Sequence, residues 1–173
     1  MTGSSTVNSP WIKLLAVFVA AGAVLSAGWF SPADAHNIGT NWRERRHIGK
    51  RAKSVLGTGY SYGGTSPSGF DCSGFTMWTF NDHGASLPHN SLDQFRTASR
   101  AGYRRIWNRR KLRRGDLVFH KTTSARVGHA GIYLGNGRFV SSTSSGGVRV
   151  RSIWDRYYWG PRWVGGTRIK SLR

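Results

Sequence analysis

The sequence GGTSPSGFDCSGF, residues 63–75, decides the fold of this chain. Its first half consists of turn-forming residues, so residues 63–69 are predicted to form a loop. Asp71 is a good N-cap residue, and we expect a helix to begin there, to continue to about His83 and to end at Gly84. Cys72 therefore lies at the start of a helix, directly after a glycine-rich loop.

Cys72 is the single cysteine of the chain. A lone cysteine is either a small buried side chain, a partner in a disulfide between chains, or a reactive thiol. At a helix start, the unpaired backbone N–H groups and the helix dipole favour the thiolate over the thiol. The thiolate is the nucleophilic form, and the same N–H groups can hold an oxyanion. The position therefore favours a reactive cysteine.

A thiol nucleophile needs a base and a group that orients the base. The chain has six histidines, and any one of them alone is more often a surface residue than a catalyst. His129 opens a predicted strand, residues 129–134, which is followed by the turn Gly135-Asn136-Gly137 and a return strand, residues 138–142. This hairpin brings side chains of its second strand close to His129.

The length of the turn decides which hydroxyl lies near His129. A three-residue turn places Thr143 opposite His129 and makes Ser141 its diagonal neighbour, within side-chain reach. A two-residue turn instead places Ser142 opposite His129. Residues 117–154 contain no carboxylate, so this hairpin supplies no acidic residue to orient the imidazole.

The other segments predict a domain of short helices and strands. Residues 36–50 are expected to be a basic linker or a leading helix, and residues 51–56 the end of a helix. We also predict a strand-like step at residues 60–62, a short helix near residues 91–99, and strands at residues 117–120 and 148–150. The aromatic residues of the tail, residues 153–169, are expected to pack in the core and at its edges.

The N-terminal region has the pattern of a signal peptide. An uncharged apolar run, residues 14–30, is followed by Ala33-Asp34-Ala35, the arrangement of small residues at which signal peptidase cleaves. We therefore predict a signal peptide at residues 1–35 and a protein exported to the periplasm, the cell wall or the extracellular space. The competing interpretation is an uncleaved membrane anchor, because the run is at the short limit for a membrane span.

The composition fits one globular domain with an unusual charge. The chain has 173 residues, 38% hydrophobic and 13% aromatic, which excludes wholesale disorder. Its 26 Lys and Arg residues against 7 Asp and Glu residues give a formal net charge of +19. Such a charge favours an anionic partner. Because export is predicted, we expect wall phosphate polymers or an acidic membrane surface and no nucleic acid. The competing interpretation is that the charge only keeps the protein soluble.

Several blocks of this sequence closely resemble the NlpC family, with the p-sixty proteins, of papain-like cell-wall cysteine endopeptidases. The resemblance runs from about Arg51 to Arg168. The blocks that carry it are Leu56-Gly57, Tyr60-x-Tyr62-Gly63-Gly64-Thr65, Gly69-Phe70-Asp71-Cys72-Ser73-Gly74-Phe75, Leu87-Pro88, Arg114-Gly115-Asp116-Leu117-Val118-Phe119, His129-x-Gly131-Ile132-Tyr133-Leu134-Gly135-Asn136-Gly137 and Gly146-Gly147-Val148. So many blocks in one order, at the family's spacing, are a specific signal.

The resemblance implies an α+β, papain-like domain at residues 51–173, after a basic lead segment at residues 36–50. A Cys-bearing helix is expected to pack on an antiparallel sheet that carries the histidine. The implied activity is hydrolysis of amide bonds in peptidoglycan stem peptides, typically the D-glutamyl link to a diamino acid, with peptidoglycan as the partner.

Residue by residue, the resemblance assigns roles in a cysteine peptidase. Cys72 is the nucleophile and His129 the base, and neither a cofactor nor a metal is expected. Tyr60 matches a tyrosine near the nucleophile that contributes to substrate or oxyanion binding. Asp71 and Ser73 flank the thiol and are expected to shape the site.

One position departs from the family's pattern, because the third catalytic position, usually a histidine, falls on Ser141. A hydroxyl can accept the imidazole N–H, but it carries no charge to stabilise the imidazolium. Activity is then reduced, assisted by water, or supported by Thr143 or Ser142. The alternatives to an active endopeptidase are a weakly active or inactive wall-binding module on the same fold, and an amidase or acyltransferase, because several nucleophiles can resolve a thioester.

Overall fold

A six-stranded antiparallel sheet forms the centre of the molecule, in a computed structural model that describes residues 42–100 and 102–170. The strand order is β3-β8-β4-β5-β6-β7. The strands are β3 (Tyr103–Ile106), β4 (Leu117–His120), β5 (His129–Gly135), β6 (Arg138–Thr143), β7 (Gly147–Ser152) and β8 (Trp163–Ile169). A separate two-stranded sheet consists of β1 (Thr65–Ser66) and β2 (Gly69–Phe70).

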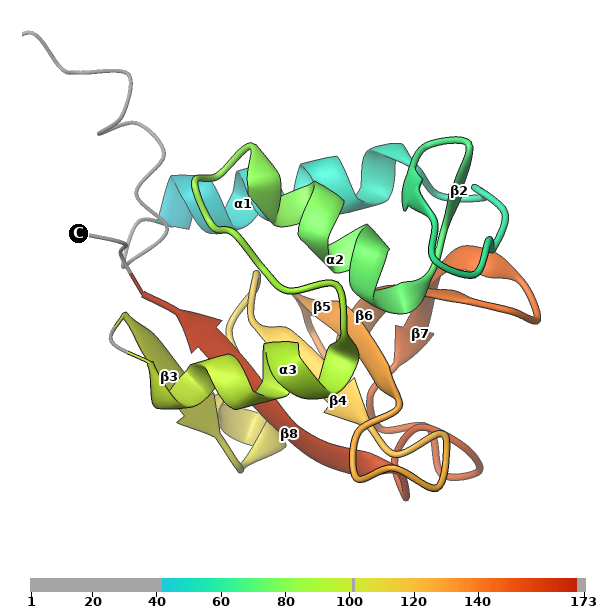
Figure 1. Cartoon of the computed structure of the whole chain (residues 1–173). Coiled ribbons are helices and arrows are strands. Elements are labelled where there is room, and N and C mark those ends of the chain that lie inside the picture. Colours follow the sequence, from blue (N-terminus) through green and yellow to red (C-terminus); the bar gives the residue numbers. More distant parts are fainter. Residues whose placement is uncertain (1–41, 101, 171–173) are drawn as a thin grey trace, which may run out of the picture.

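Helices pack against this sheet. They are α1 (Trp42–Ser54), α2 (Cys72–Asn81) and α3 (Ser91–Arg96), with the short 3-10 helices η2 (Thr97–Ser99) and η3 (Arg109–Lys111). Figure 1 shows α1 and α2 side by side above the sheet and α3 in front of it. The expected α+β class is confirmed, with the Cys-bearing helix packed on the antiparallel sheet that carries His129.

Helix α1 runs through the boundary that we expected between residues 50 and 51. Of the two expectations for this segment, a linker or a leading helix, residues 42–50 adopt the helix, and Ile48 is fully buried. The predicted signal peptide, residues 1–35, lies outside the described residues. Within the part of the chain that the structure describes, no helix is long and apolar enough to cross a membrane.

Asp116 connects α1 to the sheet. Its carboxylate is fully buried and accepts hydrogen bonds from Nη1 of Arg45 in α1 at 3.1 Å, and from Nε and Nη2 of Arg168 in β8 at 2.9 and 2.7 Å. Removing one partner of such a buried ion pair typically costs about 3–5 kcal/mol, because the other charge is left uncompensated. The Arg-Gly-Asp turn before β4 is therefore a structural anchor, and α1 is part of the domain.

The β5–β6 hairpin combines both expected turns. Ile132 pairs with Val140, which is the register of the three-residue turn. A bulge before Gly135 then shifts the register, so Gly135 pairs with Arg138 and the turn itself has two residues, 136–137. Both turn residues have positive φ, 52° and 71°, as a type I′ turn requires. The bulge therefore keeps the register that makes Ser141 the diagonal neighbour of His129.

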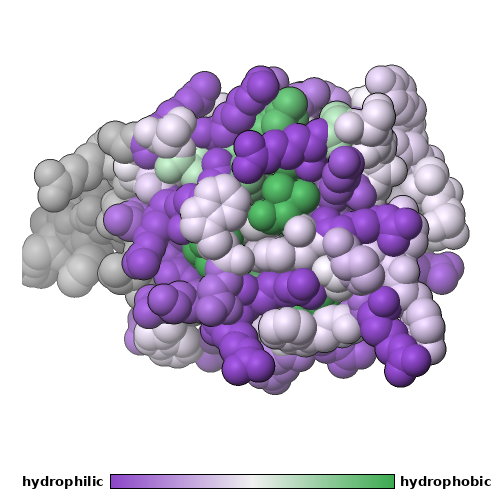
Figure 2. All heavy atoms as spheres, turned by 90° about the horizontal axis from the view of Figure 1, so that it is seen from below, coloured by the Kyte–Doolittle hydropathy of each residue, from purple (hydrophilic) through white to green (hydrophobic). Residues whose placement is uncertain are grey.

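The aromatic tail lies only partly in the core. Trp159 is buried, as expected, but Trp154, Tyr157 and Tyr158 are 50%, 78% and 43% exposed, so the expectation is wrong for these three side chains. An arginine guanidinium lies between 4.0 and 5.0 Å from the centroid of each of these rings. Figure 2 shows the molecule from below, where hydrophilic side chains cover most of the face and hydrophobic ones are confined to small areas between them.

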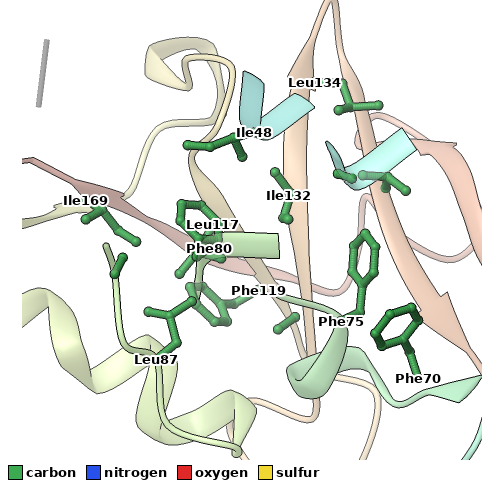
Figure 3. Close-up of a cluster of buried hydrophobic side chains, with 14 of the residues drawn as sticks. Ile48, Phe70, Phe75, Phe80, Leu87, Leu117, Phe119, Ile132, Leu134 and Ile169 are labelled. Atoms are coloured by element: carbon green, nitrogen blue, oxygen red, sulfur yellow. The ribbon is translucent and has the colours of Figure 1, made fainter. Parts of the chain in front are cut away.

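Alternation along β5 divides its side chains between two cores. Ile132 and Leu134 belong to the core beneath the helices, whereas Tyr133 belongs to a second cluster on the opposite face of the sheet. Figure 3 shows the first core, where side chains from the helices and the sheet meet, among them Ile48, Phe75, Phe80, Leu117 and Ile132. Each such burial contributes about 1.5–3 kcal/mol. This core holds α2, and with it Cys72, against the strand that begins at His129.

Candidate active site

Asp71 holds the loop before α2 to the helix. Its backbone is extended, with φ −84° and ψ 177°, and its Oδ1 accepts the Gly74 N–H at 2.6 Å, as an N-cap does. Oδ1 also accepts the Ser73 hydroxyl at 2.9 Å, while Oδ2 accepts the Gly63 N–H at 3.1 Å and lies 2.9 Å from His89 Nε2. Asp71 and Ser73 thus shape the turn that presents the single cysteine.

Close backbone contacts explain the glycines around this turn. A Cβ on Gly74 would lie 2.1 Å from the carbonyl oxygen of Gly64, and a Cβ on Gly64 would lie 2.3 Å from that of Gly69. Both distances are far below van der Waals contact, so the loop can fold against the first turn of α2 only with glycine at both positions. The glycine-rich loop is therefore a packing requirement of the site.

Cys72 is the first residue of α2 and is half-buried. Burial raises the pKa of the Cys72 thiol above its ordinary value, although the backbone N–H groups of Ala130, Ser73 and Cys72 itself act in the opposite direction. The position at a helix start predicts a preference for the thiolate, but burial of the thiol outweighs this effect. Cys72 therefore rests as a thiol at neutral pH and needs a base to remove its proton.

His129 lies beside this thiol. Helix α2 packs against β5, and both residues line the same cleft. The backbone N–H that lowers the pKa of the thiol, that of Ala130, belongs to the residue after His129. His129 is 6% exposed, and burial, together with the charge of Arg151, lowers the pKa of its imidazole to about 3. The imidazole is therefore neutral, the form that accepts a proton. Its Nε2 is buried without a hydrogen-bond partner among the described residues.

The hydroxyls that the sequence places near His129 have different surroundings. Ser142 Oγ donates to a backbone carbonyl of β2 at 2.8 Å, and Thr143 Oγ1 accepts a hydrogen bond from Arg151 Nη2 at 2.6 Å. Ser141 is fully buried, and its Oγ has no partner within the described part of the chain. None of these hydroxyls is hydrogen-bonded to Nε2 of His129 in this structure.

Aromatic rings pack against His129 instead. The ring centroid of Trp159 is 5.0 Å from that of His129, and the ring centroid of His120 is 6.4 Å away. His120 pairs with His129 across β4 and β5, is fully buried and stacks on Phe139 at 5.0 Å. Burial lowers the pKa of His120 well below its ordinary value, so its imidazole is also neutral. Ring packing therefore restrains the plane of the His129 imidazole.

Cys72 and His129 line one open cleft of about 430 Å³. Tyr60 also lines it, and burial, followed by the charges of Cys72 and Asp71, raises the pKa of its phenol, which keeps the hydroxyl a hydrogen-bond donor. Hydroxyl groups from the loops before β5 and after β6 complete much of the lining. The described residues contain no group of three or more His, Cys, Asp or Glu side chains that could hold a metal ion.

The structure brings some of the predicted site residues into the cleft and leaves others outside it. Tyr60, Cys72 and His129 line the cleft, whereas Asp71, Ser73 and Ser141 lie outside its lining. Trp159 and Arg151 also line it and are not predicted from the sequence. No local signal marks them, because Trp159 belongs to an irregular segment and Arg151 alternates with other residues in an arginine-rich strand.

Comparison with known proteins identifies relatives of this chain. Residues 57–168 match the model of the NlpC/P60 family. LytE of Bacillus subtilis (strain 168), a probable peptidoglycan endopeptidase, is 38% identical over 122 residues, which cover 68% of this chain and 32% of LytE. The gamma-DL-glutamyl hydrolase of the same organism is 32% identical over 128 residues, which cover 72% of this chain and 30% of that protein. The chain thus spans about a third of the length of these two relatives.

A solved structure agrees with the sequence match. The crystal structure of an NlpC/P60 family protein from Bacillus cereus has a TM-score of 0.62 and 27% sequence identity, over 70% of this chain and 39% of that one. The matched region contains the glycine-rich loop, all of α2 and the whole β5–β6 hairpin. The chain therefore belongs to the NlpC/P60 family and has its papain-like α+β fold.

Proposed function

We propose that this protein is a cysteine endopeptidase that hydrolyses amide bonds in peptidoglycan stem peptides. The observation that carries the proposal is that Cys72, the first residue of α2, and His129, the first residue of β5, line a single cleft. The activity named for LytE supports the choice of peptidoglycan as the substrate.

The first half of the reaction transfers the acyl group to the thiol. Cys72 Sγ attacks the amide carbonyl carbon while the neutral His129 takes the thiol proton on Nδ1, because Nε2 is buried. The C–N bond then breaks, and His129 returns this proton to the leaving amine. A thioester remains on Cys72, and the amine product departs with no net change in protonation.

Hydrolysis of the thioester completes the cycle. A water molecule gives one proton to His129 and attacks the carbonyl carbon, and the C–S bond breaks. The proton returns from His129 to the Cys72 sulfur, which restores the thiol. The product leaves as a carboxylic acid that contains the water oxygen, and it loses the second water proton to solvent to become the carboxylate.

The negative charge that develops on the carbonyl oxygen needs hydrogen-bond donors. The first N–H groups of α2 have no partner in the preceding turn of the helix, and those of Cys72 and Ser73 act to lower the pKa of the thiol, as they would stabilise any negative charge at this position. The Tyr60 hydroxyl is a further donor, since its pKa is raised. We propose these groups as the oxyanion site, with Asp71 fixing the helix start through its N-cap bond.

For the bond that is cut, we propose the D-glutamyl link to a diamino acid. The gamma-DL-glutamyl hydrolase among the relatives supports a γ-glutamyl carbonyl as the group attacked. An amidase or acyltransferase on the same scaffold would release different products, so product identity separates the three reactions.

The test is digestion of purified peptidoglycan, with the released peptides identified by mass spectrometry. The wild type is expected to release fragments that begin at the diamino acid, and Cys72→Ala and His129→Ala to release none above background. His47→Ala is the matched control, because His47 is exposed on α1, outside the cleft. Release by Cys72→Ala equal to that by the wild type would show that the mechanism is wrong.

We also propose that the chain is exported, with residues 1–35 removed as a signal peptide. The small residues at 33–35 after the apolar run support this proposal. N-terminal sequencing of the protein recovered from expressing bacteria is expected to begin at His36. An intact N-terminus in the membrane fraction would instead support the uncleaved anchor.

The positive charge supports binding to anionic wall polymers. The formal net charge is +19, and arginines of the tail lie over exposed aromatic rings. We expect the protein to sediment with isolated cell walls, and to do so less as salt rises or after anionic polymers are stripped. Binding that does not change with salt or with stripping would count against this role.

A second candidate function is a wall-binding module with little turnover. Nε2 of His129 and Oγ of Ser141 favour it, since neither has a hydrogen-bond partner among the described residues and neither orients the other. This candidate predicts that the wild type binds cell walls without releasing peptides. Efficient release by the unmodified protein would exclude it.

A further inference from the structure

Arg151 is the one lysine or arginine among the residues that line the cleft, and the lining contains no aspartate or glutamate. It comes from β7 and lies near the proposed base, since both residues line the cleft and both pack against the ring of Trp159. Its side chain is half-buried, so part of the hydration of its charge is lost. A partly buried cation such as this one needs polar or negatively charged groups that compensate for the lost hydration.

Neutral groups hold Arg151 in place. Its Nη1 donates to the carbonyl oxygens of Ser141 at 3.2 Å and of Arg149 at 3.0 Å, and its Nη2 donates to Thr143 Oγ1 at 2.6 Å. The guanidinium carbon also lies 5.6 Å from the centroid of the Trp159 ring. No carboxylate of the described residues lies within salt-bridge distance of Arg151.

The guanidinium keeps donors for a ligand. It has five N–H groups, and the three hydrogen bonds above leave the Nε–H and one Nη2–H without an acceptor among the described residues. Two such N–H groups on a fixed plane match the two oxygens of a carboxylate. The chemistry of the open donors therefore points to an anionic, planar group on the substrate.

The substrate class under the proposed function carries such a group. A D-glutamyl residue that is linked through its γ-carbonyl keeps a free α-carboxylate a few bonds from the carbon that Cys72 attacks. We propose that Arg151 is the specificity residue of the cleft and binds this α-carboxylate through its two open N–H groups. This inference rests on the proposed function, because it identifies the part of the substrate that the cleft recognises.

Binding at this position also bears on the base. After burial, the charge of Arg151 is the second cause of the low pKa of His129. A carboxylate that pairs with Arg151 offsets this charge and makes protonated His129 less costly. The substrate itself thus supplies part of the negative charge that Ser141, as an uncharged residue, does not supply.

The experiment uses two synthetic peptides that differ only at the D-glutamyl residue, one with a free α-carboxylate and one with an α-carboxamide. Their kcat/KM values are measured for the wild type, Arg151→Gln and Arg149→Gln. Arg149 is the matched control, because it is exposed on the same strand and carries the same charge. The wild type is expected to prefer the carboxylate by about 10- to 100-fold, the range for a charged hydrogen-bonded pair.

Arg151→Gln is expected to lose this preference, because its kcat/KM on the carboxylate peptide falls to about its value on the carboxamide peptide. Arg149→Gln is expected to keep the preference. A wild type that does not distinguish the two peptides overturns the proposal without need of a variant. The proposal is also overturned if Arg151→Gln retains the preference for the carboxylate peptide, or if it loses activity equally on both peptides.

A binding measurement separates this proposal from the proposed function. Calorimetric titration of Cys72→Ala with the two peptides reports recognition without chemistry, and adding Arg151→Gln in that background should abolish the preference for the carboxylate. If the wild type cleaves neither peptide but this preference is seen, the endopeptidase activity is wrong and the carboxylate site stands. If cleavage is seen but Arg151 does not affect the preference, the endopeptidase activity stands and the carboxylate site is wrong.

Discussion

His120 makes the stability of this protein sensitive to acid. Its imidazole is fully buried among aromatic rings, neither ring nitrogen has a hydrogen-bond partner among the described residues, and burial lowers its pKa well below the ordinary value. In the unfolded chain, the pKa returns to about 6.5. Below that pH the unfolded state binds a proton that the folded state does not bind, so the free energy of unfolding falls as the pH drops.

The size of this effect follows from the two pKa values. A histidine that stays neutral in the folded state lowers the free energy of unfolding by about 2 kcal/mol at pH 5.0 and by less than ~0.1 kcal/mol at pH 7.5. His129, whose pKa is lowered to about 3, contributes a similar loss over the same range. Together they remove about 4 kcal/mol, which is a large part of the roughly 5–15 kcal/mol that stabilises a typical domain.

The assay is urea unfolding at pH 7.5 and pH 5.0 for the wild type, His120→Phe and, as a control, His47→Phe on the exposed side of α1. His120→Phe should reduce the loss between the two pH values by about 2 kcal/mol. The larger phenyl ring can change stability through packing, but that change is the same at both pH values and cancels. An acid-induced loss that is the same in His120→Phe and the wild type would refute the reasoning.

Two further predictions concern packing and hydroxyl groups at the site. Gly74→Ala should lower the free energy of unfolding by more than about 3 kcal/mol or prevent folding, because its Cβ would lie 2.1 Å from the Gly64 oxygen. Gly59→Ala is the control, since no atom lies within 4 Å of its Cβ, and it should cost under about 1 kcal/mol. Thermal unfolding measures both. Ser141→Ala should leave stability unchanged or higher and lower kcat/KM less than about tenfold, since its hydroxyl has no partner in the part of the chain that the structure describes. Ser142→Ala should lose about 1 kcal/mol of stability together with its hydrogen bond. A stability loss in Ser141→Ala equal to that in Ser142→Ala would contradict this assignment.

The local parts of the fold are predicted well from the sequence. The N-cap at Asp71 and the turn-forming residues before it mark the start of α2, and the Gly135-Asn136-Gly137 sequence marks the β5–β6 hairpin. These signals are short-range, because each depends on backbone preferences of adjacent residues. The bulge before Gly135 is not predicted, and the register that it preserves is one of the two that the sequence leaves open.

The non-local parts of the fold are not predicted. β8 lies between β3 and β4, yet its sequence contains Gly165 and Gly166, which weaken the pattern of a strand. Two of the four residues of β3 are arginines, and the strand lies at the edge of the sheet. Both strands exist because distant segments pair, and no local signal reports such pairing.

The same limit applies to the site. Cys72 and His129 can be chosen from the sequence, since a helix start and a strand start are local features. The reversal of the Cys72 preference, from thiolate to thiol, arises from burial, which depends on the whole fold. The positions of Trp159 and Arg151 in the cleft depend on how the last loop and β7 pack beside His129.

The central claim is that Cys72 and His129 act together as nucleophile and base. The most direct measurement is kcat/KM on one defined γ-D-glutamyl peptide for the wild type, Cys72→Ala and His129→Ala, with circular dichroism to confirm folding. Each variant is expected to fall at least ~1000-fold while remaining folded, because a nucleophile and its base act as one unit. Activity in either folded variant within tenfold of the wild type would contradict the account.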